Sequence, residues 1–333
     1  MTARDVAARA GVSVTTVSRV LNDKAVDLTP ATCERVRVAA RELGYQVHPA
    51  ASALRRGRTG TLGLVVPDIG DQYFHRIARG VEDAIRPQGF GIVFCDTDRD
   101  ASLEDEAVDM LLSKGVDGIV LCGGGLDDDR HLRSRRWHNT PVVTIGPHRL
   151  DFPAISADDV GAVAALVRHL HEGGRRRILC VAGQPTWLVT KQRLVGYHTA
   201  VEELGLDDDP KLVVHAGFTA EAGEHAVRQA RERGIDFDAV VAFDDYAALG
   251  ALHALQALGI AVPEDVAVAG CDDIDFARFA RVPLTSVRFP TYEMGRAAAR
   301  LLAPPPGERE EVVAAFGFEL HVRESSAPAG RRG

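Results

Sequence analysis

After residue 60, short apolar runs alternate with amphipathic stretches, and this alternation limits the fold more than any other feature of the sequence. The runs LGLVV (62–66), GIVFC (91–95) and DGIVLC (117–122) are apolar and strand-like, while IARGVEDAI (77–85) and LEDEAVDMLLSK (103–114) have helical spacing. The pattern continues through PVVTIG, ILCVAG, KLVVHA, DAVVAF and VAVAGC. Continuous apolar strands separated by helices are typical of parallel sheets covered on both faces. We therefore predict a doubly wound parallel α/β architecture for this part of the chain.

The strand-like runs fall into two groups. Roughly four precede residue 157 and roughly four follow it, which predicts two similar α/β lobes within 60–330. A chain of 333 residues is long enough for two or three domains. We expect the first lobe to comprise about 60–157 and 288–307, and the second about 158–287 and 308–326, with late segments crossing between them.

The first 46 residues have a helical pattern instead. Expected helices span 3–10, 14–22 and 30–43, and glycines follow the first and third of them. Ser13 is a candidate N-cap for the second helix, and Thr29 followed by proline is a candidate cap for the third. Residues 1–46 therefore read as a small helical domain.

Charge separates the two parts of the chain. Residues 1–60 hold ten Lys/Arg against five Asp/Glu, a net charge of +5, whereas the whole chain carries −8. The remainder therefore carries −13. A basic N-terminal part on an acidic body indicates a polyanionic partner for the N-terminal part alone.

The first two expected helices are joined by the tight turn AGVS, which predicts a helix-turn-helix. If the apolar side of the second helix packs inward, its other side presents Val14, Thr15, Thr16, Ser18 and Arg19. Small side chains allow a helix to enter the major groove, methyl groups can contact thymine methyls, and arginine can bridge guanine O6 and N7. The alternative is an ordinary solvated helix face.

Several blocks in the same order extend this interpretation over nearly the whole chain: RDVAARAGVSVTTVSRVLND, TPATCERVRVAARELGY, TGTLGLVVPDI, RLVGY, PLTSVRFPTYEMG and VRESS. Together they resemble the LacI family of bacterial transcription regulators. The resemblance implies a helix-turn-helix DNA-binding domain (1–46), a hinge helix (47–59) and an effector-binding and dimerisation domain (60–330) of the periplasmic sugar-binding type. It also implies a repressor that binds a near-palindromic operator as a homodimer, or as a higher oligomer, and responds to a small effector.

The resemblance assigns roles to the DNA-contacting residues. Val14 and Thr15 would choose between operators, Arg19 would contact a base, and Thr16 and Ser18 would contact phosphates.

In the hinge, Leu54 would insert between base pairs of the minor groove, and Arg55 would neutralise a nearby phosphate. The hinge departs from the family at Val47-His48-Pro49, where a Pro-Asn pair is usual, and at Ser52, where arginine is frequent.

Positions that match the family's effector contacts form a chemically consistent set: Asp71, Tyr73, Phe74, Arg193, Phe218, Asp245 and Asp272. Carboxylates accept hydrogen bonds from neighbouring hydroxyls, arginine donates in a fork, and aromatic faces pack on a sugar ring. Trp187 is a further aromatic candidate. Asp245 and Asp272 could instead cap the helices after their strands, and the two phenylalanines could belong to the core. The acids favour a neutral sugar, while Tyr73-Phe74 keeps a purine or nucleoside effector open.

Other function classes lack sequence support. We find no GxxxxGK[ST] loop, no strand-linked GxGxxG and no readable Ser/His/Asp arrangement, so we expect no enzyme, no cofactor and no metal. The five cysteines lie far apart in apolar runs and are expected to be buried thiols. Charged residues within MTARDVAARAG, where a secretory signal needs an apolar core, favour a cytoplasmic regulator over a solute-binding receptor.

Overall fold

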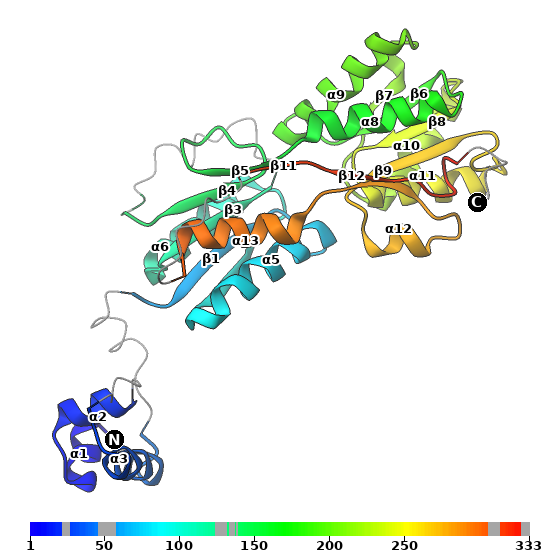
Figure 1. Ribbon diagram of the computed structural model, residues 1–333. Coiled ribbons are helices and arrows are strands. Elements are labelled where there is room, and N and C mark those ends of the chain that lie inside the picture. The colour runs from blue at the N-terminus through cyan, green and yellow to red at the C-terminus, as the bar shows by residue number, and fades with distance from the viewer. Residues whose placement is uncertain are drawn as a thin grey trace. The chain divides into compact units, whose positions relative to one another are not determined.

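The computed structural model describes residues 1–21, 27–45, 58–123, 132, 137, 139–305 and 314–327. The chain divides into two compact units, Met1–Gly60 and Thr61–Gly333 (Figure 1). Within the described ranges, no helix combines the length and the apolar character needed to cross a membrane.

The first unit is built from three short helices, α1 (Ala3–Ala10), α2 (Val14–Leu21) and α3 (Pro30–Glu42). Gly11 ends α1 with φ +63°, a left-handed conformation that glycine adopts without strain. The Ser13 hydroxyl accepts a hydrogen bond from the Thr16 amide at 3.1 Å, and the Thr29 hydroxyl caps α3. The helices share one apolar core, formed by Val6, Ala7, Ala10, Val17, Val20, Val36, Ala39 and Ala40. The three predicted helices and the predicted caps at Ser13 and Thr29 are therefore present.

The second unit begins with a six-stranded sheet in the order β11-β5-β4-β3-β1-β2. Its first part comprises β1 (Thr61–Val66), α5 (Gln72–Ile85), η1 (Arg86–Gln88), β2 (Gly91–Asp96), α6 (Ala101–Lys114), β3 (Gly118–Cys122), β4 (Val142–Ile145) and β5 (Ala154–Ala157). Leu64 and Val66 of β1 point into one core cluster, while Val65 points into another on the opposite face. Both faces of the sheet are buried, which explains why the strands read as continuous apolar runs.

The second lobe repeats this plan, with the sheet order β12-β10-β9-β8-β6-β7. It comprises α8 (Asp159–Glu172), β6 (Ile178–Ala182), α9 (Leu188–Leu204), η2 (Pro210–Leu212), β7 (Val213–His215), α10 (Ala220–Glu232), β8 (Ala239–Ala242), α11 (Asp245–Ala257), β9 (Ala267–Cys271), α12 (Asp275–Phe279) and β10 (Thr285–Arg288). The strands of both sheets pair in parallel, except that β10 pairs antiparallel with β12. The predicted doubly wound parallel α/β lobes are therefore present.

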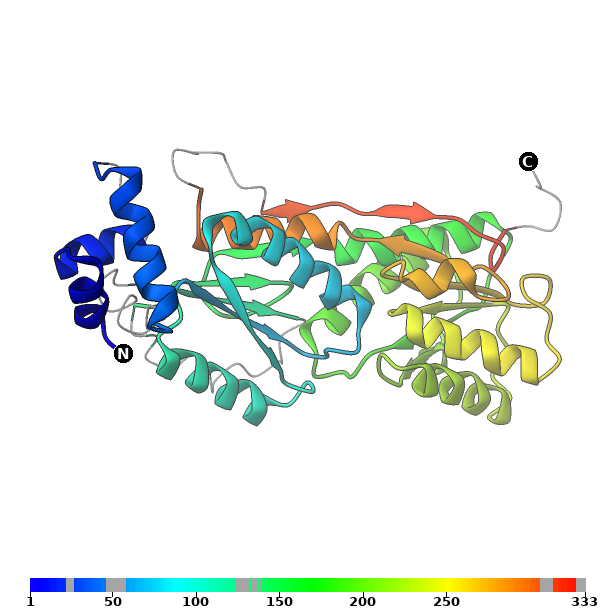
Figure 2. The ribbon, with the colours of Figure 1, turned by 90° about the horizontal axis from the view of Figure 1, so that it is seen from below.

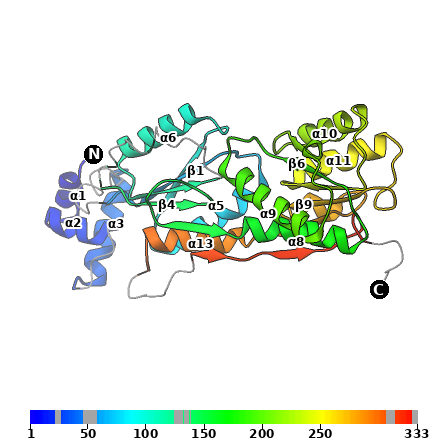
Figure 3. The same cartoon turned by 90° about the horizontal axis from the view of Figure 1, so that it is seen from above.

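The C-terminal part of the chain serves both lobes. Helix α13 (Thr291–Leu302) packs on α5 of the first lobe, β11 (Ala315–Phe316) pairs with β5, and β12 (Glu319–His321) returns to the second sheet. Figures 2 and 3 show the segment with β11 and β12 running along both lobes. The sequence assigned all of 308–326 to the second lobe, whereas residues 315–316 complete the first sheet.

Glycines bring helices close together in both lobes. A Cβ atom at Gly80 of α5 would overlap the backbone carbonyl of Tyr292, and one at Gly295 of α13 would overlap that of Ile77. In the second lobe, Gly223 of α10 meets α11 in the same way. At these glycines the backbones of the two packed helices lie closer together than they could if the position carried a Cβ atom.

Candidate functional site

A pocket lies at the carboxyl ends of the strands of both sheets. It encloses about 500 Å³ of empty space, including the part open to solvent. Its lining residues follow successive strands: Asp71, Tyr73 and Phe74 after β1, Arg99 after β2, Gly123 after β3, Gly146 and Pro147 after β4, Ala157 in β5, Phe218 after β7, Asp244 after β8 and Asp272 after β9. Ile145, Asp159, Val189 and Arg193 complete it. The carboxyl edge of an open parallel sheet is the usual binding position in this kind of fold.

Six of the seven residues predicted from sequence line this pocket: Asp71, Tyr73, Phe74, Arg193, Phe218 and Asp272. The seventh, Asp245, lies outside it. Arg99, Asp159 and Asp244, none of which is among the seven predicted contacts, also line it.

On the side of the first lobe, Asp71 caps helix α5. Its Oδ1 accepts a hydrogen bond from the Tyr73 amide at 2.8 Å, and its Oδ2 lies 3.7 Å from the Arg99 guanidinium. Burial raises the pKa of Asp71, although the Tyr73 amide and the Arg99 charge act against this. Tyr73 contacts Phe74 edge-on, with ring centroids 5.1 Å apart. The cap therefore orients a carboxylate and an aromatic ring toward the pocket together.

On the side of the second lobe, Arg193 of α9 is the central cation. Its side chain is only 5% exposed, Nε donates to Asp159 Oδ1 at 2.7 Å, and one terminal nitrogen lies 3.5 Å from Asp272 Oδ1. The other terminal nitrogen donates to the Phe243 carbonyl. Burial lowers the pKa of Arg193, but the carboxylates of Asp159 and Asp272 outweigh burial and raise it well above its ordinary value. Arg193 is therefore a fixed, charged donor.

Asp272 has an unusual backbone and an unusual acidity. Its φ of +103° belongs to a region that residues other than glycine rarely adopt, and such positions concentrate at functional sites. Burial raises the pKa of Asp272 to about 7, although Arg193 acts in the opposite direction. A carboxyl group with this pKa can accept or donate a hydrogen bond near neutral pH.

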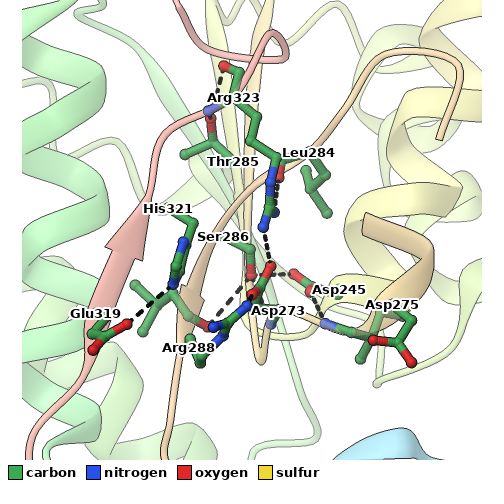
Figure 4. A network of polar contacts seen from close by, with 12 residues as sticks. Asp245, Asp273, Asp275, Leu284, Thr285, Ser286, Arg288, Glu319, His321 and Arg323 are labelled. Carbon is green, nitrogen blue, oxygen red and sulfur yellow. Dashed lines mark hydrogen bonds and ion pairs between the residues drawn. The ribbon is translucent and has the colours of Figure 1, made fainter. Parts of the chain in front are cut away.

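Asp244 and Asp245 have different roles, and the sequence predicted the pocket position for Asp245 instead of Asp244. Asp244 lines the pocket and caps α11, accepting a hydrogen bond from the Ala247 amide at 3.0 Å. Asp245 is fully buried and does not line the pocket. Its Oδ1 accepts from Ser286 Oγ at 2.6 Å (Figure 4), and its Oδ2 accepts from the Ile274 amide at 2.9 Å. Both oxygens of Asp245 are thus engaged by the protein. The cap that the sequence considered for Asp245 is made by Asp244.

Asp273 anchors the strands that cross between the lobes (Figure 4). It pairs with Arg288 of β10 and with Arg323, which follows β12, each at 2.5 Å. Burial would raise the pKa of Asp273, but the two guanidinium groups outweigh burial and lower it. The turn after β9 therefore presents Asp272 to the pocket and ties Asp273 to the crossing strands.

Aromatic side chains line the pocket from both lobes: Tyr73 and Phe74 from the first and Phe218 from the second. Trp187 and Phe218 contact each other with ring centroids 5.1 Å apart. Arg99 of the first lobe lies over both rings. The signal that could have indicated Arg99 is its place in the acid-rich turn DTDRD directly after a strand.

In the first unit, helix α2 presents the predicted DNA-contacting face. Val14 is 44% exposed, and Thr15 is exposed as well. Thr16 and Ser18 are half-buried, and Arg19 pairs with Asp27 at 2.9 Å. Val17 and Val20 on the opposite side are buried, as predicted. The hinge residues Leu54 and Arg55 lie outside the described residues.

Family models match both parts of this chain. "Bacterial regulatory proteins, lacI family" matches residues 2–48, and "Periplasmic binding protein-like domain" matches residues 167–326. These matches define a transcription regulator with a helix-turn-helix domain and a periplasmic-binding-protein-like body.

Named relatives place the chain in one family. It is 35% identical over 306 residues to the HTH-type transcriptional repressor CytR of Escherichia coli (strain K12), covering 90% of this chain and 88% of that protein. It is 37% identical over 332 residues to the HTH-type transcriptional regulator CelR of Thermobifida fusca, covering 96% of each. The chain belongs to the LacI family of bacterial regulatory proteins.

Solved structures agree with the fold. A transcriptional regulator CelR–cellobiose complex matches with a TM-score of 0.72 and 36% identity, covering 98% of this chain and 99% of that chain. The lac repressor dimer bound to operator and the anti-inducer ONPF matches with a TM-score of 0.85 at 22% identity, covering 98% and 99%. At that identity, the second likeness supports the fold alone.

Proposed function

We propose that this LacI-family regulator is a repressor that binds a near-palindromic operator as a homodimer and responds to a sugar. It would act in the cytoplasm on the nucleoid, without catalysing a reaction. The observation that carries the proposal is the pocket, in which fixed donors, carboxylate acceptors and aromatic faces converge at the carboxyl ends of both sheets. This is the set of groups that recognises neighbouring hydroxyls and the C–H face of a sugar ring.

The sugar class is supported by the relative solved with cellobiose, which is similar over nearly the whole chain. A purine or nucleoside effector is not favoured. The effector contacts we propose are Asp71, Tyr73, Phe74, Arg193, Phe218 and Asp272, joined by Arg99, Asp159 and Asp244.

For DNA, we infer that α2 enters the major groove. Val14 and Thr15 would select the operator, Arg19 would exchange its pairing with Asp27 for a guanine, and Thr16 and Ser18 would contact phosphates. Leu54 and Arg55 would act in the minor groove.

The test begins with an operator selected from random inverted repeats, whose binding is measured with and without cellobiose or adenosine. We expect cellobiose, or a related glycoside, to change operator binding. The Arg193→Ala variant should require a sugar concentration more than about tenfold higher for the same change in operator binding, because a charged hydrogen-bond donor contributes about 1.5–3 kcal/mol. Arg168→Ala is the matched control, because Arg168 is a half-exposed arginine of α8 that pairs with Glu203.

Two results would contradict this assignment. The proposed pocket is incorrect if Arg193→Ala responds at the sugar concentrations that suffice for the wild type. If operator binding responds to adenosine and not to sugars, the effector is a nucleoside. Phe218→Leu provides the same test if Arg193→Ala does not fold.

A further inference from the structure

Arg99 joins the two lobes across the pocket. It follows β2 of the first lobe, yet its guanidinium carbon lies 4.8 Å from the ring centroid of Trp187 and 5.4 Å from that of Phe218, both in the second lobe. A terminal nitrogen lies 3.7 Å from Asp71 Oδ2 of its own lobe. The side chain is only 18% exposed, so these contacts are partly shielded from water.

The backbone holds Arg99 in place for this contact. Asp98 and Arg99 both have positive φ values, +46° and +56°, and the Arg99 amide donates to the Pro67 carbonyl at 3.0 Å. Two successive non-glycine residues in this region are uncommon and persist only where the surroundings enforce them. The turn therefore directs the guanidinium to the opposite lobe instead of leaving it in solvent.

The charges in the pocket make this contact important. Asp71 comes from the first lobe, and Asp244 and Asp272 come from the second, so bringing the lobes together brings carboxylates together. Burial raises the pKa of all three, and the charge of Asp71 raises the pKa of both Asp244 and Asp272 further. Arg193 offsets the charge on the second lobe, and Arg99 offsets that of Asp71 on the first.

We propose that Arg99 is a positioning residue that holds the two lobes together, by neutralising Asp71 and stacking on Trp187 and Phe218. The lobe angle at rest then depends on this contact. If the proposed function holds, on which this consequence rests, Arg99 thereby sets the effector concentration at which operator binding changes.

A second contact between the lobes provides a reporter. The Asp275 amide donates to Gln72 Oε1 of the first lobe at 2.8 Å, and Arg76 pairs with the Asp275 carboxylate at 2.9 Å. Asp275 is the first residue of α12, where an amide has no partner within its own helix. Its hydrogen exchange therefore reports whether the lobes are joined.

The experiment measures hydrogen–deuterium exchange of the full chain without sugar or DNA, so its outcome is independent of the proposed function. Arg99→Ala and Trp187→Leu should each raise the exchange rate of the Asp275 amide roughly two- to thirtyfold, which corresponds to about 0.5–2 kcal/mol. Arg99→Lys keeps the charge and should give a smaller rise. Arg79→Ala, an exposed arginine of α5, is the control and should leave the rate unchanged.

In the double variant Arg99→Ala/Trp187→Leu, the Asp275 amide should exchange no faster than in the faster of the two single variants, because both substitutions remove the same contact. The proposal is overturned if either single variant exchanges at the wild-type rate, or if the two effects add in full. If Arg99→Ala does not fold, Trp187→Leu and Arg99→Lys decide the question by the same measurement.

Discussion

Replacing Asp272 by asparagine should make the protein more stable at neutral and higher pH. Burial raises the pKa of Asp272 from 3.8 to about 7 despite the nearby Arg193. A folded-state pKa above the unfolded value means that the folded state binds more protons between these two values. The contribution of Asp272 to the free energy of unfolding is therefore most favourable below about pH 4. It decreases as the pH rises from about 4 to 7 and is least favourable above pH 7.

The size of the effect follows from the shift. About three pKa units at about 1.36 kcal/mol each correspond to about 4 kcal/mol as an upper limit. Asparagine resembles the neutral carboxyl group, so Asp272→Asn should gain up to this amount at pH 8 and up to about 1.6 kcal/mol at pH 5, where only about 1.2 of the three pKa units have been crossed. The pKa values of Asp71 and Asp244 are raised in the same direction, so some of the pH dependence should remain in the variant.

Urea titrations at pH 5 and pH 8, monitored by tryptophan fluorescence, measure the free energy of unfolding of the wild type and of Asp272→Asn. Both tryptophans, Trp137 and Trp187, lie in the second unit, so the signal reports that unit. Asp236→Asn, at an exposed position of the same lobe, should change neither value. If Asp272→Asn lowers stability at pH 8 more than at pH 5, the reasoning is refuted, because ionised Asp272 would then stabilise the fold.

Three further outcomes are expected. Asp245→Ala should lower the free energy of unfolding by about 3 kcal/mol in urea titrations, because it leaves Ser286 Oγ and a buried amide without their acceptor; unchanged stability would contradict the structural role. Gly295→Ala should lower it by about 1–3 kcal/mol, since the added methyl group overlaps the Ile77 carbonyl and forces α13 away from α5; a more stable variant would rule out that close packing. Arg19→Ala should reduce the preference for operator over random DNA by about 1–3 kcal/mol in gel-shift titrations, and equal losses on both DNAs would argue against base contact.

Much of the site could be predicted from the chain alone. Asp272 follows β9 directly, Asp71 and Phe218 lie in the turns after β1 and β7, and the carboxyl ends of parallel strands meet at one edge. Arg193 was recognisable through the RLVGY block. In the first unit, the caps and spacings predicted all three helices, because those signals act within a few residues.

Other residues were decided by packing between distant segments. Asp244 and Asp245 are equivalent in the string FDDYA, and only Ser286 of β10 and the Ile274 amide determine which of them turns away from the pocket. The role of Arg99 depends on Trp187 and Phe218, about ninety or more positions away in the sequence. Periodicity and capping are local and can be read along the chain, whereas the partner of a charged side chain depends on how two lobes meet. The sequence by itself thus determined the elements and the strand ends that carry the site, and the tertiary structure decided which side chains face each other there.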